Sequence, residues 1–280
     1  MTEKLMRVQA KLTARDLTLL GWLEDHGVLT SFQIAHALFP SVNFAQRRLR
    51  SLMNDDLVDR FRPQRQDGGS HPYHYVLGQL GADVVSAQRG ADPPRRDHAR
   101  KRRWQLTNRA NLPHLLGVND FFIRLNGYAR THPGAELARW WPAKRCQGVG
   151  AFAGPAVTDA QQLAYVARIR PDGHGIWVEA GRELPFFLEY DTGTEPLSVL
   201  VAKLAGYAQL ADVTSQRWPV LFSLHSSVRE ANLHRQLTAN DVRYPVATTV
   251  REAADVSGSP ADAVWWRHRR EGPLTRLIDI

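Results

Sequence analysis

Cysteine is nearly absent from this sequence: Cys146 is the only one in 280 residues. A single thiol excludes an internal disulfide and a zinc site built from cysteines. The sequence also lacks a run of about 18 apolar residues that could span a membrane, and its first residues lack the apolar core of a secretion signal. We therefore expect a cytoplasmic protein with no membrane partner.

Motifs for nucleotide binding are missing as well. Gly148, Gly150 and Gly154 form a glycine-rich segment, but their spacing is not that of a dinucleotide fingerprint, and no Walker A sequence occurs. No internal repeat or low-complexity segment is present. The content of 43% hydrophobic and 23% charged residues is that of an ordinary globular protein, and the length suffices for two domains.

Acidic residues are scarce in the first part of the chain. Residues 1–110 contain 18 Lys and Arg against 11 Asp and Glu, whereas residues 111–280 contain 18 against 17. The net charge of +8 is therefore concentrated near the N-terminus. This distribution predicts a polyanionic partner for the first third of the chain.

Residues 1–90 have the pattern of three short helices followed by a hairpin. The helix starts carry the capping signals T-x-x-D at 13–16, T-x-x-Q at 30–33 and N-x-x-Q at 43–46. Two strands, 58–62 and 73–77, flank a polar, glycine-rich tip. This order predicts a winged helix-turn-helix domain, in which the third helix enters the major groove and the hairpin lies along the phosphates.

Double-stranded DNA is the partner that this domain predicts. The candidate contacts are Asn43, Gln46, Arg47 and Arg50 on the third helix, and Arg60, Arg62, Arg65 and His71 on the wing. The alternative is a solvated basic face on a structural or protein-binding winged helix. Residues 91–110 are predicted to be a basic linker, either following the DNA backbone or simply solvated.

Residues 111–280 are predicted to form an α/β domain. Helices are expected over 113–130, after Thr194 and over 227–237, and strands over 136–141, 163–170, 176–178, 184–190, 218–225 and 244–250. The first helix precedes a group of strands, and strands and helices then alternate. This order favours a mixed sheet covered by helices.

Acidic side chains gather at one place in this second domain. Asp172 lies in a Pro-Asp-Gly turn, and Glu189 and Asp191 lie two residues apart at the end of a strand, on one face. A hairpin turning at residues 180–182 would carry Asp172 towards Glu189. Lys203 and Tyr207 lie one turn apart on the next helix, from which a cation could reach these carboxylates.

This arrangement is similar to the core of the PD-(D/E)XK phosphodiesterase superfamily. The resemblance implies that Asp172 and Glu189, with Asp191 as a further ligand, hold Mg²⁺ or Mn²⁺, as hard cations prefer oxygen ligands. The superfamily has a lysine two residues after the second carboxylate, where this chain has Asp191. Lys203 is the candidate replacement, which makes Asp172, Glu189 and Lys203 the candidate catalytic residues.

Longer motifs resemble the replication-relaxation family of actinobacterial plasmids and integrative elements. They are L-T-A-R-D at 12–16, G-Q-L-G-A at 78–82, R-P-D-G at 170–173, F-L-E-Y-D-T-G-T-E-P at 187–196 and K-L-A-G-Y at 203–207. The resemblance implies a DNA-binding accessory protein of plasmid replication or mobilisation.

Several alternatives follow from the residues. The second domain is an inactive phosphodiesterase core, or an active endonuclease or nickase, or the chain is an adaptor for replication or conjugation proteins. The sequence also leaves a homodimer as an alternative. In the structural alternative, Asp172 only shapes a turn, and Glu189 and Asp191 pair with Arg170, Arg182 or Lys203.

Overall fold

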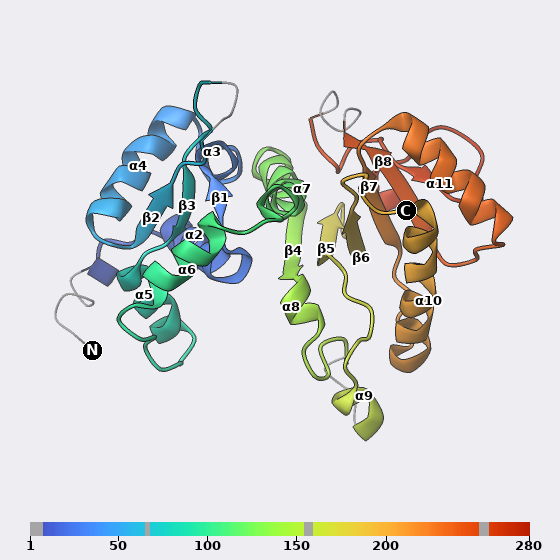
Figure 1. Cartoon of the computed structure of the whole chain (residues 1–280), viewed down its shortest axis with the longest axis horizontal. Coiled ribbons are helices and arrows are strands. Elements are labelled where there is room, and N and C mark those ends of the chain that lie inside the picture. The colour runs from blue at the N-terminus through green and yellow to red at the C-terminus, as the bar shows by residue number, and fades with distance from the viewer. Residues whose placement is uncertain (1–7, 65–67, 154–158, 252–257) are drawn as a thin grey trace. The chain divides into compact units, whose positions relative to one another are not determined.

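The computed structural model describes residues 8–64, 68–153, 159–251 and 258–280 (Figure 1). The chain divides into two compact units, Met1–Ile123 and Arg124–Ile280. The first contains a three-stranded sheet and the second a six-stranded mixed sheet, each accompanied by helices. The combination of helices with sheets that the sequence predicts, including a mixed sheet in the second unit, is confirmed. Within the described ranges, we find no helix with the length and apolar character that a membrane span requires.

The first unit begins with three helices and ends in helical segments. Its elements are α2 (Ala14–His26), β1 (Leu29–Thr30), α3 (Ser31–Leu38), α4 (Val42–Asn54), β2 (Val58–Phe61), β3 (His74–Leu77), α5 (Gln79–Gln88), α6 (His98–Thr107) and the first part of α7 (Leu112–Thr131). The sheet is antiparallel in the order β1-β3-β2. The expected hairpin is thus present as β2 and β3, and a short strand before α3 extends it.

In α2, α3 and α4 the first residue of the helix is determined by hydrogen bonds to a capping side chain. Thr13 and Thr30 form the predicted capping boxes, each accepting a hydrogen bond from the backbone N–H of the third helical residue, whose side chain accepts one in return. The prediction that Asn43 starts the third helix was wrong. Ser41 has the extended backbone of a cap and accepts from the Phe44 N–H, so the helix begins earlier and Asn43 lies in its first turn.

Arg48 fastens α4 to the start of α2. Its guanidinium donates hydrogen bonds to both oxygens of the buried Asp16 (2.9 and 2.6 Å). Burial acts to raise the pKa of Asp16, but the hydrogen bonds from Arg48 and Thr13 outweigh it and lower that pKa. Arg48 is therefore a structural residue, unlike its neighbours on the exposed side of α4.

Helix α6 occupies much of the stretch expected to be a linker. Arg102 donates to Glu24 (2.6 Å) and Arg103 donates to Asp59 (2.5 Å). Leu106 is buried with Val28 and other apolar residues of this unit. Part of the basic run therefore holds a helix against the first unit, because the chain places acidic partners opposite two of its arginines.

Two glycines in helices offer a matched test of the packing of this unit. A β-carbon on Gly81 of α5 would lie 2.0 Å from the Leu57 carbonyl oxygen, whereas one on Gly21 of α2 would meet nothing within 4 Å. We expect Gly81→Ala to lower the free energy of unfolding by about 3 kcal/mol, because backbone must move. Gly21→Ala should raise it by about 1 kcal/mol through helix propensity. Denaturant unfolding of both variants measures the contrast, and equal effects would contradict it.

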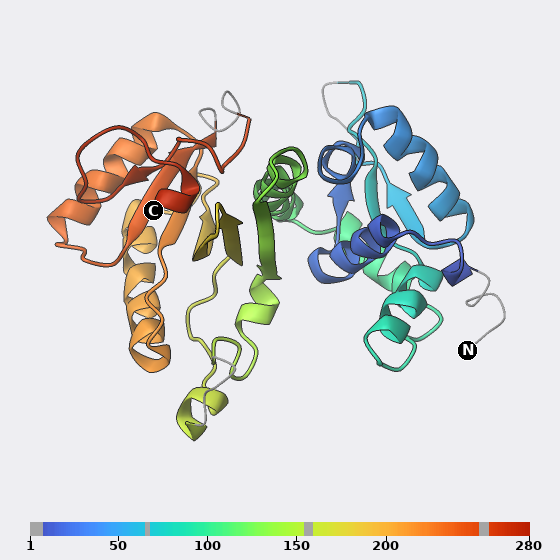
Figure 2. The same ribbon diagram turned by 180° about the vertical axis from the view of Figure 1, so that it is seen from behind.

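The second unit is a sheet with helices packed on it (Figures 1 and 2). Its elements are the rest of α7, β4 (Ala135–Pro142), α8 (Ala143–Cys146), α9 (Ala160–Ala164), β5 (Gly173–Glu179), β6 (Arg182–Tyr190), α10 (Leu197–Thr214), β7 (Val220–Leu224), α11 (Ser227–Ala239), β8 (Val246–Val250), β9 (Trp266–Arg267) and the 3-10 turn η1 (Leu277–Asp279). The strand order is β4-β5-β6-β7-β8-β9. Strands β6, β7 and β8 are mutually parallel and the other pairs are antiparallel.

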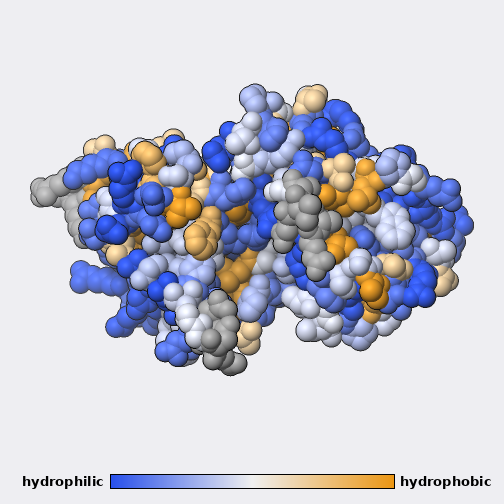
Figure 3. Space-filling view, turned by 90° about the horizontal axis from the view of Figure 1, so that it is seen from above, coloured by the Kyte–Doolittle hydropathy of each residue, from blue (hydrophilic) through white to orange (hydrophobic). Residues whose placement is uncertain are grey.

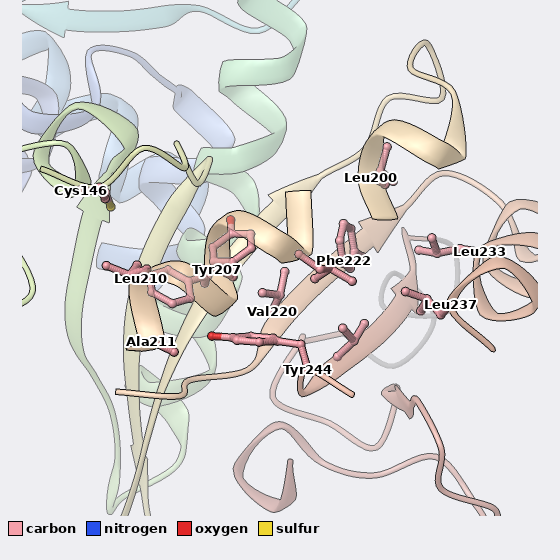
Figure 4. Close-up of a cluster of buried hydrophobic side chains, with 14 of the residues drawn as sticks. Cys146, Leu200, Tyr207, Leu210, Ala211, Val220, Phe222, Leu233, Leu237 and Tyr244 are labelled. Carbon is pink, nitrogen blue, oxygen red and sulfur yellow. The ribbon is translucent and has the colours of Figure 1, made fainter. Parts of the chain in front are cut away.

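Helices α10 and α11 cover one face of this sheet. Leu200 and Tyr207 of α10, Leu233 of α11 and Phe222 of β7 belong to one buried cluster (Figure 4). On the opposite face, Tyr128 of α7 makes an edge contact with Trp177 of β5. The alternation of side chains along β5 thus places Trp177 on the face opposite the cluster beneath α10 and α11.

The strand expected over 163–170 is absent, and this prediction was wrong. Helix α9 ends at Ala164, and β5 begins only at Gly173. Both edges of β5 are already paired, with β4 and with β6, so no edge is left there for a further strand. The apolar residues Ala167 and Ile169 instead pack on the cluster beneath α10.

His174 of β5 is buried in an aromatic cage and provides a pH test. Its imidazole ring contacts the aromatic rings of Trp141, Phe152, Phe187 and Trp218. Burial lowers the pKa of His174 to about 3. The stability due to the neutral ring is present above the unfolded pKa of about 6.5 and is lost as pH falls below it.

We expect the free energy of unfolding of the wild type to fall by up to about 2 kcal/mol more than that of His174→Phe between about pH 7 and about pH 5. Urea unfolding of both proteins at the two pH values measures this difference. His132→Phe, at an exposed position directly after α7, is the control and should follow the wild type. A variant with the same pH dependence as the wild type would contradict the assignment.

Candidate functional site

Two carboxylates meet where β5 and β6 pair. The register places Gly173 opposite Leu188, so Asp172 comes opposite Glu189. The Asp172 backbone N–H donates to the Leu188 carbonyl (3.0 Å), and its carboxylate accepts from the Tyr190 N–H (2.8 Å). The turn at Ala180 and Gly181, both with positive φ, joins the two strands as predicted. Asp172 thus both fixes the strand end and faces the Glu189 side chain.

Helix α10 supplies two partners for Glu189. Lys203 Nζ donates to Oε2 (2.8 Å), and the Tyr207 hydroxyl donates to Oε1 (2.5 Å). Lys203 also lies 3.3 Å from the carboxylate of Glu195, in the segment before the helix. The predicted one-turn spacing of Lys203 and Tyr207 is therefore what allows both to reach the same carboxylate.

The electrostatics of this group are those of a crowded acidic site. Burial, followed by the neighbouring Asp172 carboxylate, raises the pKa of Glu189 to about 7, against the opposing effect of Lys203. Burial acts to lower the pKa of Lys203, but Glu189 outweighs it and raises that pKa. Burial also raises the pKa of Tyr207. A negative charge on Glu189 is thus unfavourable unless cations stand beside it.

The candidate base-reading residues lie on the open side of α4. Asn43, Gln46, Arg47 and Arg50 are exposed, while Ala45, Leu49 and Leu52 are buried beneath them. The guanidinium of Arg47 lies over the ring of Phe44 (4.6 Å), which is itself exposed. The helix therefore presents polar and basic groups together with an aromatic ring.

On the hairpin, the arginines gather around one tyrosine. Arg60 and Arg62 lie over the ring of Tyr73, at 3.7 and 4.7 Å from its centroid. Arg62 also donates to the His71 carbonyl (2.6 Å). Arg65, predicted as a further contact, lies outside the described residues. The two strands thus hold two cations in fixed positions beside the tip.

Comparison with known proteins identifies a family for most of the chain. Residues 20–224 match the family model described as replication-relaxation. The chain belongs to the replication-relaxation family. The resemblance predicted from the motifs is confirmed, and it indicates a role in the replication of a plasmid or mobile element. No curated protein and no solved structure matches the chain.

In this replication-relaxation protein Asp191 has partners of its own. Arg229 of α11 donates to both of its oxygens (2.5 and 2.8 Å), and His225 Nδ1 lies 3.5 Å from Oδ2. Burial acts to raise the pKa of Asp191, but the hydrogen bonds from Arg229 and the Gly193 backbone outweigh it and lower that pKa. In the described part of the chain, no three His, Cys, Asp or Glu side chains form a group able to hold a metal ion. The predicted trio with Asp172 and Glu189 is therefore not assembled.

The structural alternative from the sequence is borne out only for some pairs. Lys203 does pair with Glu189, whereas Arg182 pairs with Asp279 (2.7 Å) rather than with the acidic group. Arg229 and His225 were missed by sequence reasoning. Both follow strand β7, and no local pattern indicates that they would meet Asp191, because that contact depends on the parallel pairing of β6 with β7.

Proposed function

We propose that this replication-relaxation protein binds duplex DNA through a winged helix-turn-helix in its first unit and hydrolyses phosphodiesters in a PD-(D/E)XK-like core in its second. The product would be a nick or a cut in DNA. The observation that carries the proposal is the meeting of Asp172, Glu189 and Lys203 at paired strand ends and the adjoining helix. These are the residue types that the superfamily uses, with lysine arriving from α10.

Magnesium fits the acidic pair by its chemistry. Asp172 and Glu189 offer carboxylate oxygens from neighbouring strands, which are the ligands that hard cations prefer. Burial, followed by the Asp172 carboxylate beside it, raises the pKa of Glu189 despite the contact with Lys203, so a further cation would stabilise the ionised pair. When bound, the metal supplies charge stabilisation to the phosphoryl group and acidifies a water molecule. Asp191, the further ligand predicted from the sequence, instead faces Arg229, which donates to both of its oxygens.

Lys203 and Tyr207 would contribute through the places in which α10 holds them. Lys203 holds a positive charge beside Glu189 and can contact the developing charge on a phosphate. Tyr207 fixes the carboxylate from the buried side, with its hydroxyl donating to Oε1. Both contacts come from one rigid helix, which suits groups that must stay in place during catalysis.

Duplex binding is supported by the exposed side of α4 and by the hairpin. Four polar or basic side chains of α4 are exposed, and the hairpin arginines are held at Tyr73. Basic side chains placed in this way neutralise phosphates and release counterions. We expect affinity for duplex DNA to fall steeply as salt rises.

The test of the proposed function is a cleavage assay on the full chain. Supercoiled plasmid incubated with purified protein and Mg²⁺ or Mn²⁺ should be converted to nicked or linear forms, and a chelator should prevent the conversion. Duplex and single-stranded oligonucleotides tested in parallel show which form is cut. Failure to cut every form of DNA with either metal would overturn the hydrolytic half of the proposal.

A second candidate function is an adaptor that binds a replication or transfer protein through the first unit. Phe32 of α3 and Val42 and Phe44 of α4 are exposed, and hydrophobic groups interrupt the hydrophilic surface in the space-filling view (Figure 3). Exposed aromatic rings are common at protein interfaces. Phe44→Ala with unchanged DNA affinity but lost partner binding would favour this function over the first.

A further inference from the structure

In the PD-(D/E)XK superfamily, the second residue after the second carboxylate is a lysine. In this chain that residue is Asp191, whose carboxylate lies beside His225. Asp191 follows Glu189 by two residues, so both lie on one face of the chain, separated by roughly 7 Å along an extended backbone. The Asp191 N–H donates to the Ser223 carbonyl (3.0 Å), which continues the pairing with β7. His225 follows Ser223 by two residues. The strand pairing therefore delivers His225 to the same edge of the sheet as the acidic pair.

The segment from Asp191 to Glu195 contacts both the side chains around Glu189 and those around Asp191. Lys203, which contacts Glu189, lies 3.3 Å from the Glu195 carboxylate. Arg229, which contacts Asp191, donates to the Glu195 carbonyl (2.5 Å). The segment from Asp191 to Glu195 thus lies against both groups, which makes them neighbours.

The loop beside His225 is shaped to receive its ring. Gly193 has φ of 84°, and a β-carbon there would lie 2.5 Å from the Cε1 atom of His225. The ring therefore packs on the bare glycine backbone, while 41% of the side chain remains exposed. A ring that is confined by a loop and a carboxylate, yet open to solvent, is placed to meet a ligand rather than to fill a core.

We propose that His225 is a catalytic residue of the phosphodiesterase site, with Asp191 as its positioning residue. The inference rests on the proposed function. Nδ1 lies 3.5 Å from Asp191 Oδ2, so a proton on Nδ1 would face that carboxylate and leave the Nε2 lone pair available, as in other histidine bases. Nε2 takes a proton from the attacking water as the new O–P bond forms. The P–O bond to the leaving oxygen breaks, and that oxygen takes a proton from solvent.

The surrounding charges suit this role for Asp191. The Arg229 guanidinium faces its carboxylate, and Arg251 donates to its backbone carbonyl (2.7 Å). The contacts from Arg229 fix the Asp191 carboxylate in place beside the imidazole. Glu195 in this segment and Lys203 of α10 carry further charges nearby. The Asp191–His225 pair would thus add a proton acceptor to the site, beside the Lys203 that α10 supplies.

Chemical rescue of cleavage tests the proposal. We expect His225→Ala to lower the rate of DNA cleavage by about 10²- to 10⁴-fold, and added imidazole to restore part of it. His225→Gln should be equally slow and should not respond to imidazole. The control is His132→Ala, at an exposed histidine of the same unit, which should cut like the wild type. If the wild type cuts and His225→Ala cuts as fast, the inference is overturned while the proposed function stands; if the wild type never cuts, both are overturned.

A second measurement needs neither metal nor cleavage. Nitrogen-15 NMR of the histidine side chains in the full chain at neutral pH should show His225 with its proton on Nδ1. The His225→Ala spectrum assigns the signal, and thermal unfolding of this variant checks its fold. A neutral ring protonated on Nε2 would overturn the inference whatever the cleavage assay shows.

Discussion

Asp172→Asn should reduce metal-dependent DNA cleavage by more than about 100-fold, because loss of a ligand costs more than loss of the groups that orient one. The substitution removes one of the two negative charges that the cation would balance. Asparagine keeps an oxygen that can accept from the Tyr190 N–H, which the native carboxylate does at 2.8 Å. The fold should therefore persist. Initial rates of plasmid nicking at equal protein and Mg²⁺ concentrations measure the effect.

The matched control is Asp212→Asn on the exposed side of α10, which removes the same charge from the same unit. This variant should cut at the rate of the wild type. Thermal unfolding of both variants separates loss of chemistry from loss of structure. Undiminished nicking by Asp172→Asn would show that Asp172 only shapes the end of the strand, as a Pro-Asp-Gly turn can.

The parts of the fold that the sequence predicted are those governed by neighbouring residues. The capping boxes at Thr13 and Thr30 formed because each needs only four consecutive residues. The hairpin of β5 and β6 formed around Ala180 and Gly181 for the same reason. The meeting of Asp172 with Glu189 could be predicted because a tight hairpin fixes its own register.

The features that sequence reasoning missed depend on contacts between distant segments. The apolar residues at 163–170 had a strand-like pattern, but β5 was already paired on both edges. Helix α6 packs through Arg102 and Arg103 because Glu24 and Asp59 lie opposite, which the basic run itself does not indicate. Local propensity cannot report such tertiary partners.

The candidate site likewise combines contacts that local sequence patterns predict with contacts that depend on distant segments. Glu189, Lys203 and Tyr207 could be grouped because helical spacing places the last two on one flank. Asp191 was grouped with Glu189 on strand periodicity, yet its side chain is held by Arg229, 38 residues further along the chain. A carboxylate at the end of a strand pairs with whatever the next crossover brings to it, and periodicity along one strand does not reveal that partner.

The double variant Arg47→Ala and Arg50→Ala should weaken duplex DNA binding by about 30-fold or more, taking about 1 kcal/mol for each contact. Both side chains are exposed on α4. Arg48 stays unchanged because it holds the buried Asp16. If both arginines contact phosphates, the slope of log affinity against log salt should also fall by about 2. Fluorescence anisotropy of a labelled duplex across a salt series measures both quantities.

The control is the double variant Arg235→Ala and Arg243→Ala, which removes two exposed positive charges from the second unit. Because the change in net charge is the same, a general electrostatic effect would weaken binding equally in both variants. A specific role of α4 requires a larger loss for Arg47 and Arg50. Equal losses would show that the duplex is attracted by overall charge. An unchanged affinity in both variants would favour the adaptor function for the first unit, and Phe44 is then the side chain to test.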